Sequence, residues 1–112
     1  MELQTKRKRV DQSILNEIVQ RIVEMTNPEK IILFGSAARG EMGPNSDIDL
    51  LVIKRGNIHR RQLAQHIHKG LYGVGEAVDI VVATPEDVDR HGKSFGLVLC
   101  SALEEGKVIY AA

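Results

Sequence analysis

The chain has 112 residues, of which 43% are hydrophobic, and its 15 Lys and Arg residues balance 15 Asp and Glu residues. This length and composition support one domain with a modest core, and zero net charge argues against nucleic acid as the main partner. The sequence lacks a run of about 18 apolar residues and has no apolar stretch after its basic N-terminus, so we expect neither a membrane-spanning segment nor a secretory signal. The single Cys excludes an internal disulfide and is typical of a reducing, cytoplasmic setting.

Hydrophobic periodicity and turn residues predict alternating helices and strands. Apolar residues recur at helical spacing over residues 14–23. Asp11 or Ser13 is the expected N-cap, and the Asn-Pro pair at 27–28 ends the helix. In chain order there follow a strand at 30–34, a break at Gly35-Ser36, a short helix at 37–41, a strand at 48–53, a helix at 58–71, a strand at 77–83, a helix that starts at Thr84-Pro85, a second helical piece at 94–104 and a final strand at 107–110.

This alternation of strands and helices predicts an α/β (α+β) domain. The strands at 48–53 and 77–83 are almost wholly apolar, which predicts that both are buried. The basic run Lys6–Arg9 repels itself, so residues 1–9 are predicted to be a flexible basic tail. The domain itself is then expected to cover residues 10–112.

Three aspartates interrupt the two apolar strands. Side chains alternate along a strand, so Asp47 and Asp49 point to one face while Ile48 points to the other. Asp79 is the lone charge in its strand, and it joins the pair if the two strands are neighbours. Close carboxylates repel each other, and Mg²⁺ removes this cost because it prefers one or two carboxylates together with substrate phosphate oxygens. Three acids near one or two metal ions suit nucleotidyl transfer. The alternative interpretation is that the three aspartates lie at strand edges and only make turn hydrogen bonds.

A Gly-Ser pair upstream of these acids offers a phosphate site. Gly35 stands at a strand-to-helix turn, where a glycine lets the backbone approach a ligand closely. The Ser36 hydroxyl and the free N–H groups at the helix start can hold phosphate oxygens. No Gly-Lys-Ser/Thr or Gly-x-Gly-x-x-Gly motif accompanies the pair, so it is neither a P-loop nor a dinucleotide fingerprint.

The combined motif resembles the signature of the polymerase-beta-like nucleotidyltransferase superfamily. Gly35-Ser36 is followed by ten residues and then by Asp47-x-Asp49. The surrounding sequence is similar to the small prokaryotic branch of minimal nucleotidyltransferase (MNT) proteins. This similarity covers Phe34-Gly-Ser-Ala-Ala-Arg-Gly and Ser46-Asp-Ile-Asp-Leu-Leu-Val, and it extends to Glu105–Tyr110. The resemblance implies the fold of this superfamily, a small mixed sheet packed with helices.

The resemblance also implies a role for each residue of the motif. Asp47 and Asp49 are the implied metal ligands. Asp79 matches the third carboxylate, a metal ligand and general base toward the acceptor hydroxyl. Gly35-Ser36 holds the triphosphate of ATP. Arg39 is a further candidate for phosphate contact, and a solvated Arg is the equal alternative.

A partner protein is the last implication of the resemblance. MNT proteins resemble the antitoxin half of HEPN/MNT toxin–antitoxin pairs, so the implied reaction is Mg²⁺-dependent transfer of AMP from ATP to a tyrosine of a HEPN ribonuclease toxin. Two alternatives stay open. One is a non-catalytic antitoxin that neutralises its partner by forming a complex. The other is a small-molecule nucleotidyltransferase of the antibiotic type, which needs a second subunit. A small domain with few aromatic residues also has reason to form homo-oligomers.

The charge balance hides a basic block. Residues 54–69 carry five Lys and Arg residues and no acid. The helix predicted at 58–71 can face RNA, a triphosphate or an acidic partner, and a solvated face is the equal alternative. With Asp47, Asp49 and Asp79 set aside as metal ligands, the rest of the chain is net basic by three. A nucleotide enzyme can use that excess.

Other reactive side chains are interpreted as structural. His59 and His66 share a helix face but lie two turns apart, which argues against a metal site. Cys100 lies in an apolar run, and we expect it to be a small buried hydrophobe. Tyr72 and Tyr110 are interpreted as packing residues, although a tyrosine can also accept a nucleotide.

Overall fold

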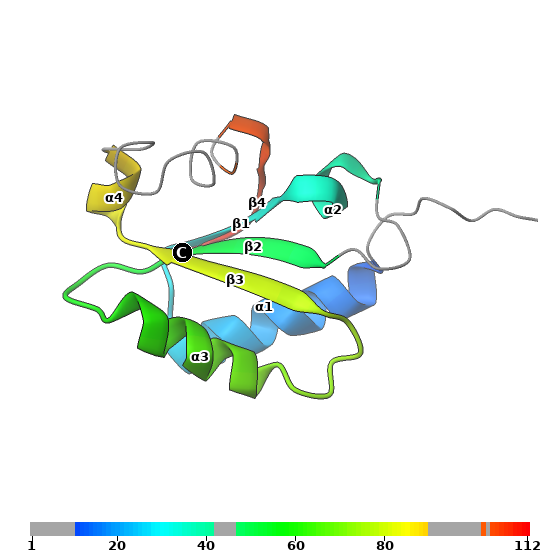
Figure 1. The fold of residues 1–112 in the computed structure, drawn as a ribbon, viewed down its shortest axis with the longest axis horizontal. Helices are drawn as coiled ribbons and strands as arrows, with labels where there is room; N and C mark the ends of the chain where they lie inside the picture. Colours follow the sequence, from blue (N-terminus) through cyan, green and yellow to red (C-terminus); the bar gives the residue numbers. More distant parts are fainter. Residues whose placement is uncertain (1–10, 42–46, 90–101, 103) are drawn as a thin grey trace, which may run out of the picture.

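The computed structural model describes residues 11–41, 47–89, 102 and 104–112 (Figure 1). The predicted basic tail, Cys100 and most of the helical piece predicted at 94–104 therefore lie outside the described residues. None of the helices in the described part of the chain is both long enough and apolar enough to cross a membrane. The elements are α1 (Gln12–Thr26), β1 (Lys30–Phe34), α2 (Gly35–Arg39), β2 (Ile48–Ile53), α3 (Arg60–Gly70), β3 (Val78–Ala83), α4 (Pro85–Asp89) and β4 (Lys107–Ala111).

The described strands form one mixed sheet in the order β3-β2-β1-β4. β1 pairs antiparallel with both β2 and β4, whereas β2 pairs parallel with β3. A parallel pair needs a crossover connection, and α3 supplies it between β2 and β3. Helices α1 and α3 cover one face of the sheet, and α4 lies on the other side (Figure 1). The predicted α/β architecture with a small mixed sheet is confirmed.

The two faces of the sheet carry separate apolar clusters. In β2, Leu50 and Val52 pack with α1 and α3, while Leu51 and Ile53 pack on the opposite face. β2 lies inside the sheet and is buried on both faces, which explains its nearly continuous apolar sequence. The predicted burial of the strand at 77–83 is only partly right. β3 is an edge strand, so its first half is open to solvent at Asp79.

The ends of α1 follow the predicted capping chemistry. The Asp11 carboxylate accepts hydrogen bonds from the backbone N–H groups of Ser13, at 2.8 Å, and Ile14, at 3.3 Å. Asp11 is therefore the N-cap, and Ser13 lies inside the helix. At the other end Asn27 adopts a left-handed conformation with φ of 50°, and its N–H donates to the Val23 carbonyl.

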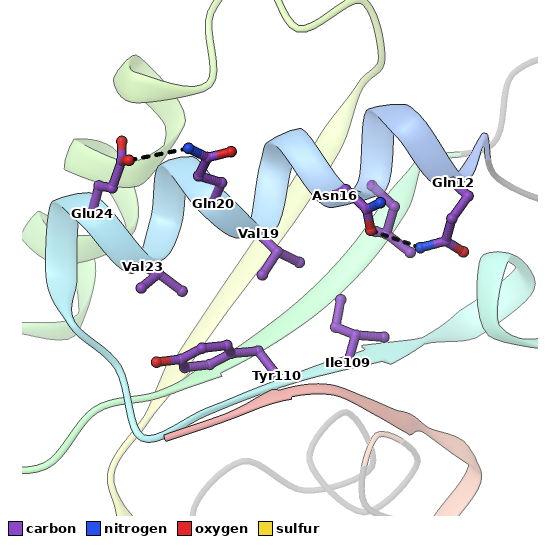
Figure 2. Close-up of a pocket in the computed structure, with 9 residues that line it drawn as sticks. Gln12, Asn16, Val19, Gln20, Val23, Glu24, Ile109 and Tyr110 are labelled. Atoms are coloured by element: carbon purple, nitrogen blue, oxygen red, sulfur yellow. Dashed lines mark hydrogen bonds between the residues drawn. The ribbon is translucent and has the colours of Figure 1, made fainter.

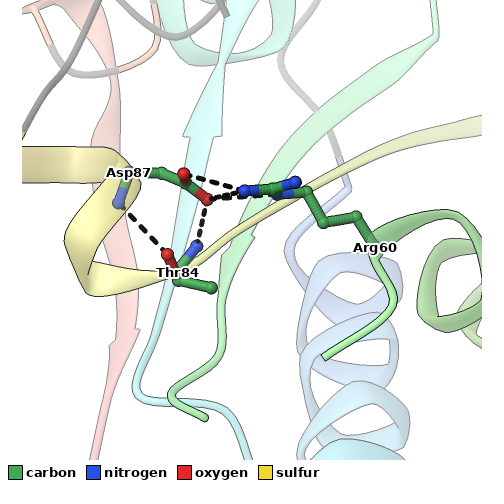
Figure 3. Close-up of polar contacts among 3 residues, drawn as sticks. All are labelled: Arg60, Thr84 and Asp87. Carbon is green, nitrogen blue, oxygen red and sulfur yellow. Dashed lines mark hydrogen bonds and ion pairs between the residues drawn. The ribbon is translucent and has the colours of Figure 1, made fainter. Parts of the chain in front are cut away.

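A buried carboxylate joins α3 to α4. Asp87 is almost fully buried and accepts two hydrogen bonds at 2.8 Å from the half-exposed guanidinium of Arg60 (Figure 3). Thr84 and Asp87 form a reciprocal cap, in which each backbone N–H donates to the other side chain. Burial alone would raise the pKa of Asp87, but the Thr84 N–H and the Arg60 guanidinium together hold it below its ordinary value.

Arg60→Ala is expected to destabilise the fold by about 2 kcal/mol, less than the loss for a fully buried pair because Arg60 is 47% exposed. The contribution of Asp87 is complete above the ordinary carboxyl pKa and is lost as the pH falls through its lowered value. Without Arg60 that pKa rises, so acid unfolding begins at a higher pH. Urea unfolding between neutral and acid pH measures both effects. Arg61→Ala is the matched control, since Arg61 is an exposed neighbour, and an equal loss in both variants would contradict the prediction.

Candidate active site

The three aspartates gather at one end of the sheet. β2 and β3 are neighbours, and their parallel register sets Asp49 directly beside Asp79. Both residues alternate with the apolar positions that face α1 and α3, so they share the opposite face with Leu51 and Val81. Asp47 lies directly before β2, two positions from Asp49. Asp79 was predicted to join Asp47 and Asp49 if the two strands are neighbours, and they are. Ile48 lies on the face opposite Asp49, as predicted.

Negative charge accumulates at this end of the sheet. Burial raises the pKa of Asp49 above its ordinary value, and the carboxylates of Asp79 and then Asp47 raise it further. The positive charge of Arg39 lowers the pKa of Asp49, and this effect is the smallest of the four. Asp49 itself is half-buried, while Asp47 and Asp79 are exposed. The local field therefore opposes the ionised form of Asp49, and a bound cation would relieve this opposition.

The donor set suits a cation that is shared with a substrate. Within the described ranges, no group of three or more acidic, His or Cys side chains is placed to hold a metal ion by itself. Mg²⁺ does not need such a cage, because it keeps several waters and uses one or two carboxylates plus phosphate oxygens. Asp47 and Asp49, two positions apart at the start of one strand, fit this requirement, and the three-carboxylate site stays a prediction.

Gly35 brings the backbone against the strand that carries Asp49. Its φ of +72° lies in the left-handed region that favours glycine. A Cβ atom at this position would overlap the Oδ2 atom of Asp49 and lie 3.3 Å from its Cγ. The Gly35 backbone and the Asp49 carboxylate are thus in direct contact. The predicted phosphate side and the predicted metal side of the site meet at this point.

The helix after β1 starts earlier than the sequence predicts. α2 begins at Gly35 and ends at Arg39, so the prediction of residues 37–41 is wrong by two positions. Gly35-Ser36 was expected to separate strand from helix, but it forms the first turn. The N-cap position is Phe34, whose side chain makes no capping hydrogen bond. Ser36 is partly buried in this turn, beside the contact between Gly35 and Asp49.

Arg39 contacts carboxylates that the sequence motif did not include. Its guanidinium lies 3.1 Å from the Glu41 carboxylate and 3.2 Å from that of Glu105. All three side chains are about half-exposed, so these pairs are weak. Glu105 lies 66 positions away along the chain, and only the β1–β4 pairing brings it near α2. Arg39 is therefore ion-paired in this structure, and its phosphate contact stays a prediction.

One cavity lies away from the carboxylates. A groove of about 460 Å³ runs between α1 and β4, with Val19, Val23, Ile109 and Tyr110 among its walls (Figure 2). Hydrogen-bonded pairs of polar side chains from α1 form its rim. None of the predicted site residues lines this groove. Tyr110 is half-buried here, which confirms its interpretation as a packing residue.

Comparison with known proteins shows the family of this chain. Residues 13–109 match the family model of the nucleotidyltransferase domain. A protein of Methanocaldococcus jannaschii, provisionally named a protein adenylyltransferase, is 30% identical over 90% of this chain and 75% of its own length. A crystal structure of a toxin–antitoxin complex with AMP-PNP is 26% identical, with a TM-score of 0.57 over 86% of this chain and 73% of that one. The MNT antitoxin complex with the tri-AMPylated HEPN toxin of Shewanella oneidensis has 24% identity and a TM-score of 0.56 over 90% and 72% of the two chains, which shows the fold.

Proposed function

Because this chain belongs to the nucleotidyltransferase domain family, and within it to the MNT branch, we propose that it transfers AMP from ATP to a tyrosine of a partner HEPN toxin and so acts as its antitoxin. The observation that carries the proposal is the register that sets Asp49 beside Asp79, with Gly35 in contact with Asp49. The proposed setting is the cytoplasm, where ATP is available.

Each residue of the site has a proposed task. Asp47 and Asp49 would hold Mg²⁺, which when bound neutralises the triphosphate and lowers the pKa of the attacking hydroxyl. The backbone at Gly35 and the Ser36 hydroxyl would position the phosphate oxygens. Asp79 is exposed beside Asp49, so it is placed to accept the proton of an incoming tyrosine. The tyrosine oxygen forms a bond to the α-phosphorus, and the bond from that phosphorus to pyrophosphate breaks.

Arg39 is the cation that we propose for the triphosphate. It lies near enough to Asp49 to lower the pKa of that carboxyl. To reach a phosphate it would exchange its contacts with Glu41 and Glu105, which are exposed and contribute little. A bidentate, charge-assisted hydrogen-bond contact with phosphate oxygens is stronger than the surface ion pair with Glu41 or with Glu105.

The names of similar proteins support a protein acceptor. The relative from Methanocaldococcus jannaschii is provisionally a protein adenylyltransferase, and one similar complex pairs an MNT antitoxin with an AMPylated HEPN toxin. These names favour a protein substrate over the small-molecule alternative.

Label transfer tests the proposal directly. ATP labelled at the α-phosphate is expected to label a co-expressed HEPN-type partner protein, and Asp47→Ala/Asp49→Ala is expected to abolish that label. Glu86→Ala/Asp89→Ala is the matched control, because it removes the same charge from two exposed positions of α4. Equal labelling by wild type and the Asp47/Asp49 variant would overturn the catalytic assignment. If the Asp47/Asp49 variant transfers no label but still protects cells from the toxin, the non-catalytic binding antitoxin is favoured instead.

A further inference from the structure

Tyr72 is the most exposed large hydrophobic side chain among the described residues. It is 90% exposed, so its interpretation as a packing residue is wrong. It stands in the connection between α3 and β3, followed by Gly73 and Gly75, both with positive φ. Tyr110, the other tyrosine of the chain, is half-buried in the groove between α1 and β4 (Figure 2). The two tyrosines therefore differ sharply in their access to a second molecule.

The backbone beneath Tyr72 is held in place. Arg21 of α1 donates hydrogen bonds of 3.1 Å to the carbonyl oxygens of both Gly70 and Tyr72. On either side of Tyr72, Leu71 and Val74 are buried in the cluster that packs against α1 and α3. The ring is thus presented on an ordered turn, which reduces the entropy lost when another protein binds it.

The proposed active site and the buried residues that flank Tyr72 lie on opposite faces of the sheet. Leu71 and Val74 belong to the cluster beneath the sheet, on the side of α1 and α3. Asp49 and Asp79 share the opposite face with Leu51. The residues that flank Tyr72 and its own carboxylates therefore lie on opposite faces of the sheet, which favours transfer to this ring from another molecule.

We propose that Tyr72 is an acceptor of AMP in trans, modified by a second copy of this chain, and this rests on the proposed function. The phenolic oxygen of Tyr72 forms a bond to the α-phosphorus of ATP bound to the second copy. The bond from that phosphorus to the bridging oxygen breaks, pyrophosphate leaves, and the phenolic proton passes to Asp79 of the second copy. The product is a tyrosyl phosphodiester, which gives the chain one additional negative charge.

Self-labelling tests this acceptor. Purified chain with Mg²⁺ and ATP labelled at the α-phosphate is expected to become labelled and to gain the mass of one adenylyl group. Tyr72→Phe is expected to lose the label completely, whereas Tyr110→Phe keeps it. Because the chain has only these two tyrosines, the pair of variants covers every tyrosine. Label that survives in Tyr72→Phe, or that disappears only in Tyr110→Phe, overturns the proposal.

A mixing experiment tests the route between copies. A tagged Asp47→Ala/Asp49→Ala chain retains Tyr72 but lacks the proposed metal ligands, and untagged Tyr72→Phe supplies the active site. Label on the tagged chain supports transfer in trans, and its absence overturns it. The HEPN protein is labelled in parallel by the same preparations. Label on that protein but not on this chain overturns only the Tyr72 acceptor, while no label on either overturns the proposed function as well.

Discussion

Asp79→Asn is expected to lower the rate of AMP transfer to the partner by a factor of about 10²–10⁴, the usual contribution of a positioned general base. Asp79 lies beside Asp49 in the parallel pair and is exposed, so it is accessible to the hydroxyl of an incoming protein. Asparagine has nearly the same shape but cannot accept the proton. The effect is measured as a single-turnover rate at saturating ATP and partner.

The same substitution is expected to leave the fold intact or slightly more stable. The carboxylate of Asp79 helps to raise the pKa of Asp49, so at neutral pH the ionised pair opposes folding. For an acid with a raised pKa, this cost is absent at low pH and develops as the pH rises through the ordinary carboxyl range. Thermal unfolding at neutral pH without Mg²⁺ should therefore show no loss of stability. Asp89→Asn is the control, and a wild-type transfer rate in Asp79→Asn would remove Asp79 from the mechanism.

Gly35→Ala is expected to reduce transfer by about 10²-fold, a loss comparable to that from a misplaced catalytic group, because the new methyl group displaces the Asp49 carboxylate. It also forces a non-glycine residue into φ of +72°, which costs about 1–2 kcal/mol. The clash adds to this cost, since the nearest atoms belong to a side chain held at the start of a buried strand. Urea unfolding and single-turnover transfer measure the two losses.

Gly56→Ala separates these two contributions. Gly56 has φ of +110°, and a Cβ atom there meets nothing within 4 Å. It therefore introduces backbone strain without a clash and lies outside the proposed site. Gly35→Ala should lose more stability than Gly56→Ala, and only Gly35→Ala should lose transfer. Equal activity in both variants would show that the contact with Asp49 does not matter for catalysis.

The sequence predicts the strands of the site better than their arrangement. The bounds of β1 and β2 were predicted correctly, because apolar runs ended by turn residues need only local information. The pairing of Asp49 with Asp79 was predicted only on the condition that the strands are neighbours, since adjacency depends on the crossover through α3. No local pattern predicts the approach of Glu105 to Arg39, because it depends on β4 returning to the edge beside β1.

Three deviations from prediction have physical causes. α2 starts at Gly35 because that residue turns directly out of β1 with a positive φ, where a break of two residues was expected. Asp79 is exposed because β3 is an edge strand, and an apolar sequence pattern does not distinguish an edge strand from an internal one. Tyr72 was assigned to packing by residue type alone, and its position on a turn after α3 leaves its ring exposed.

The position of β2 inside the sheet gives the two central carboxylates unequal local stability. Asp49 belongs to a strand that is hydrogen-bonded on both sides and buried on both faces, so we expect its release to require unfolding of the whole domain. Asp79 belongs to an edge strand, whose beginning we expect to open in brief sub-global fluctuations while the rest stays native. One half of the site is thus as rigid as the domain itself. The half that we propose faces the incoming protein can adjust to it without weakening the fold.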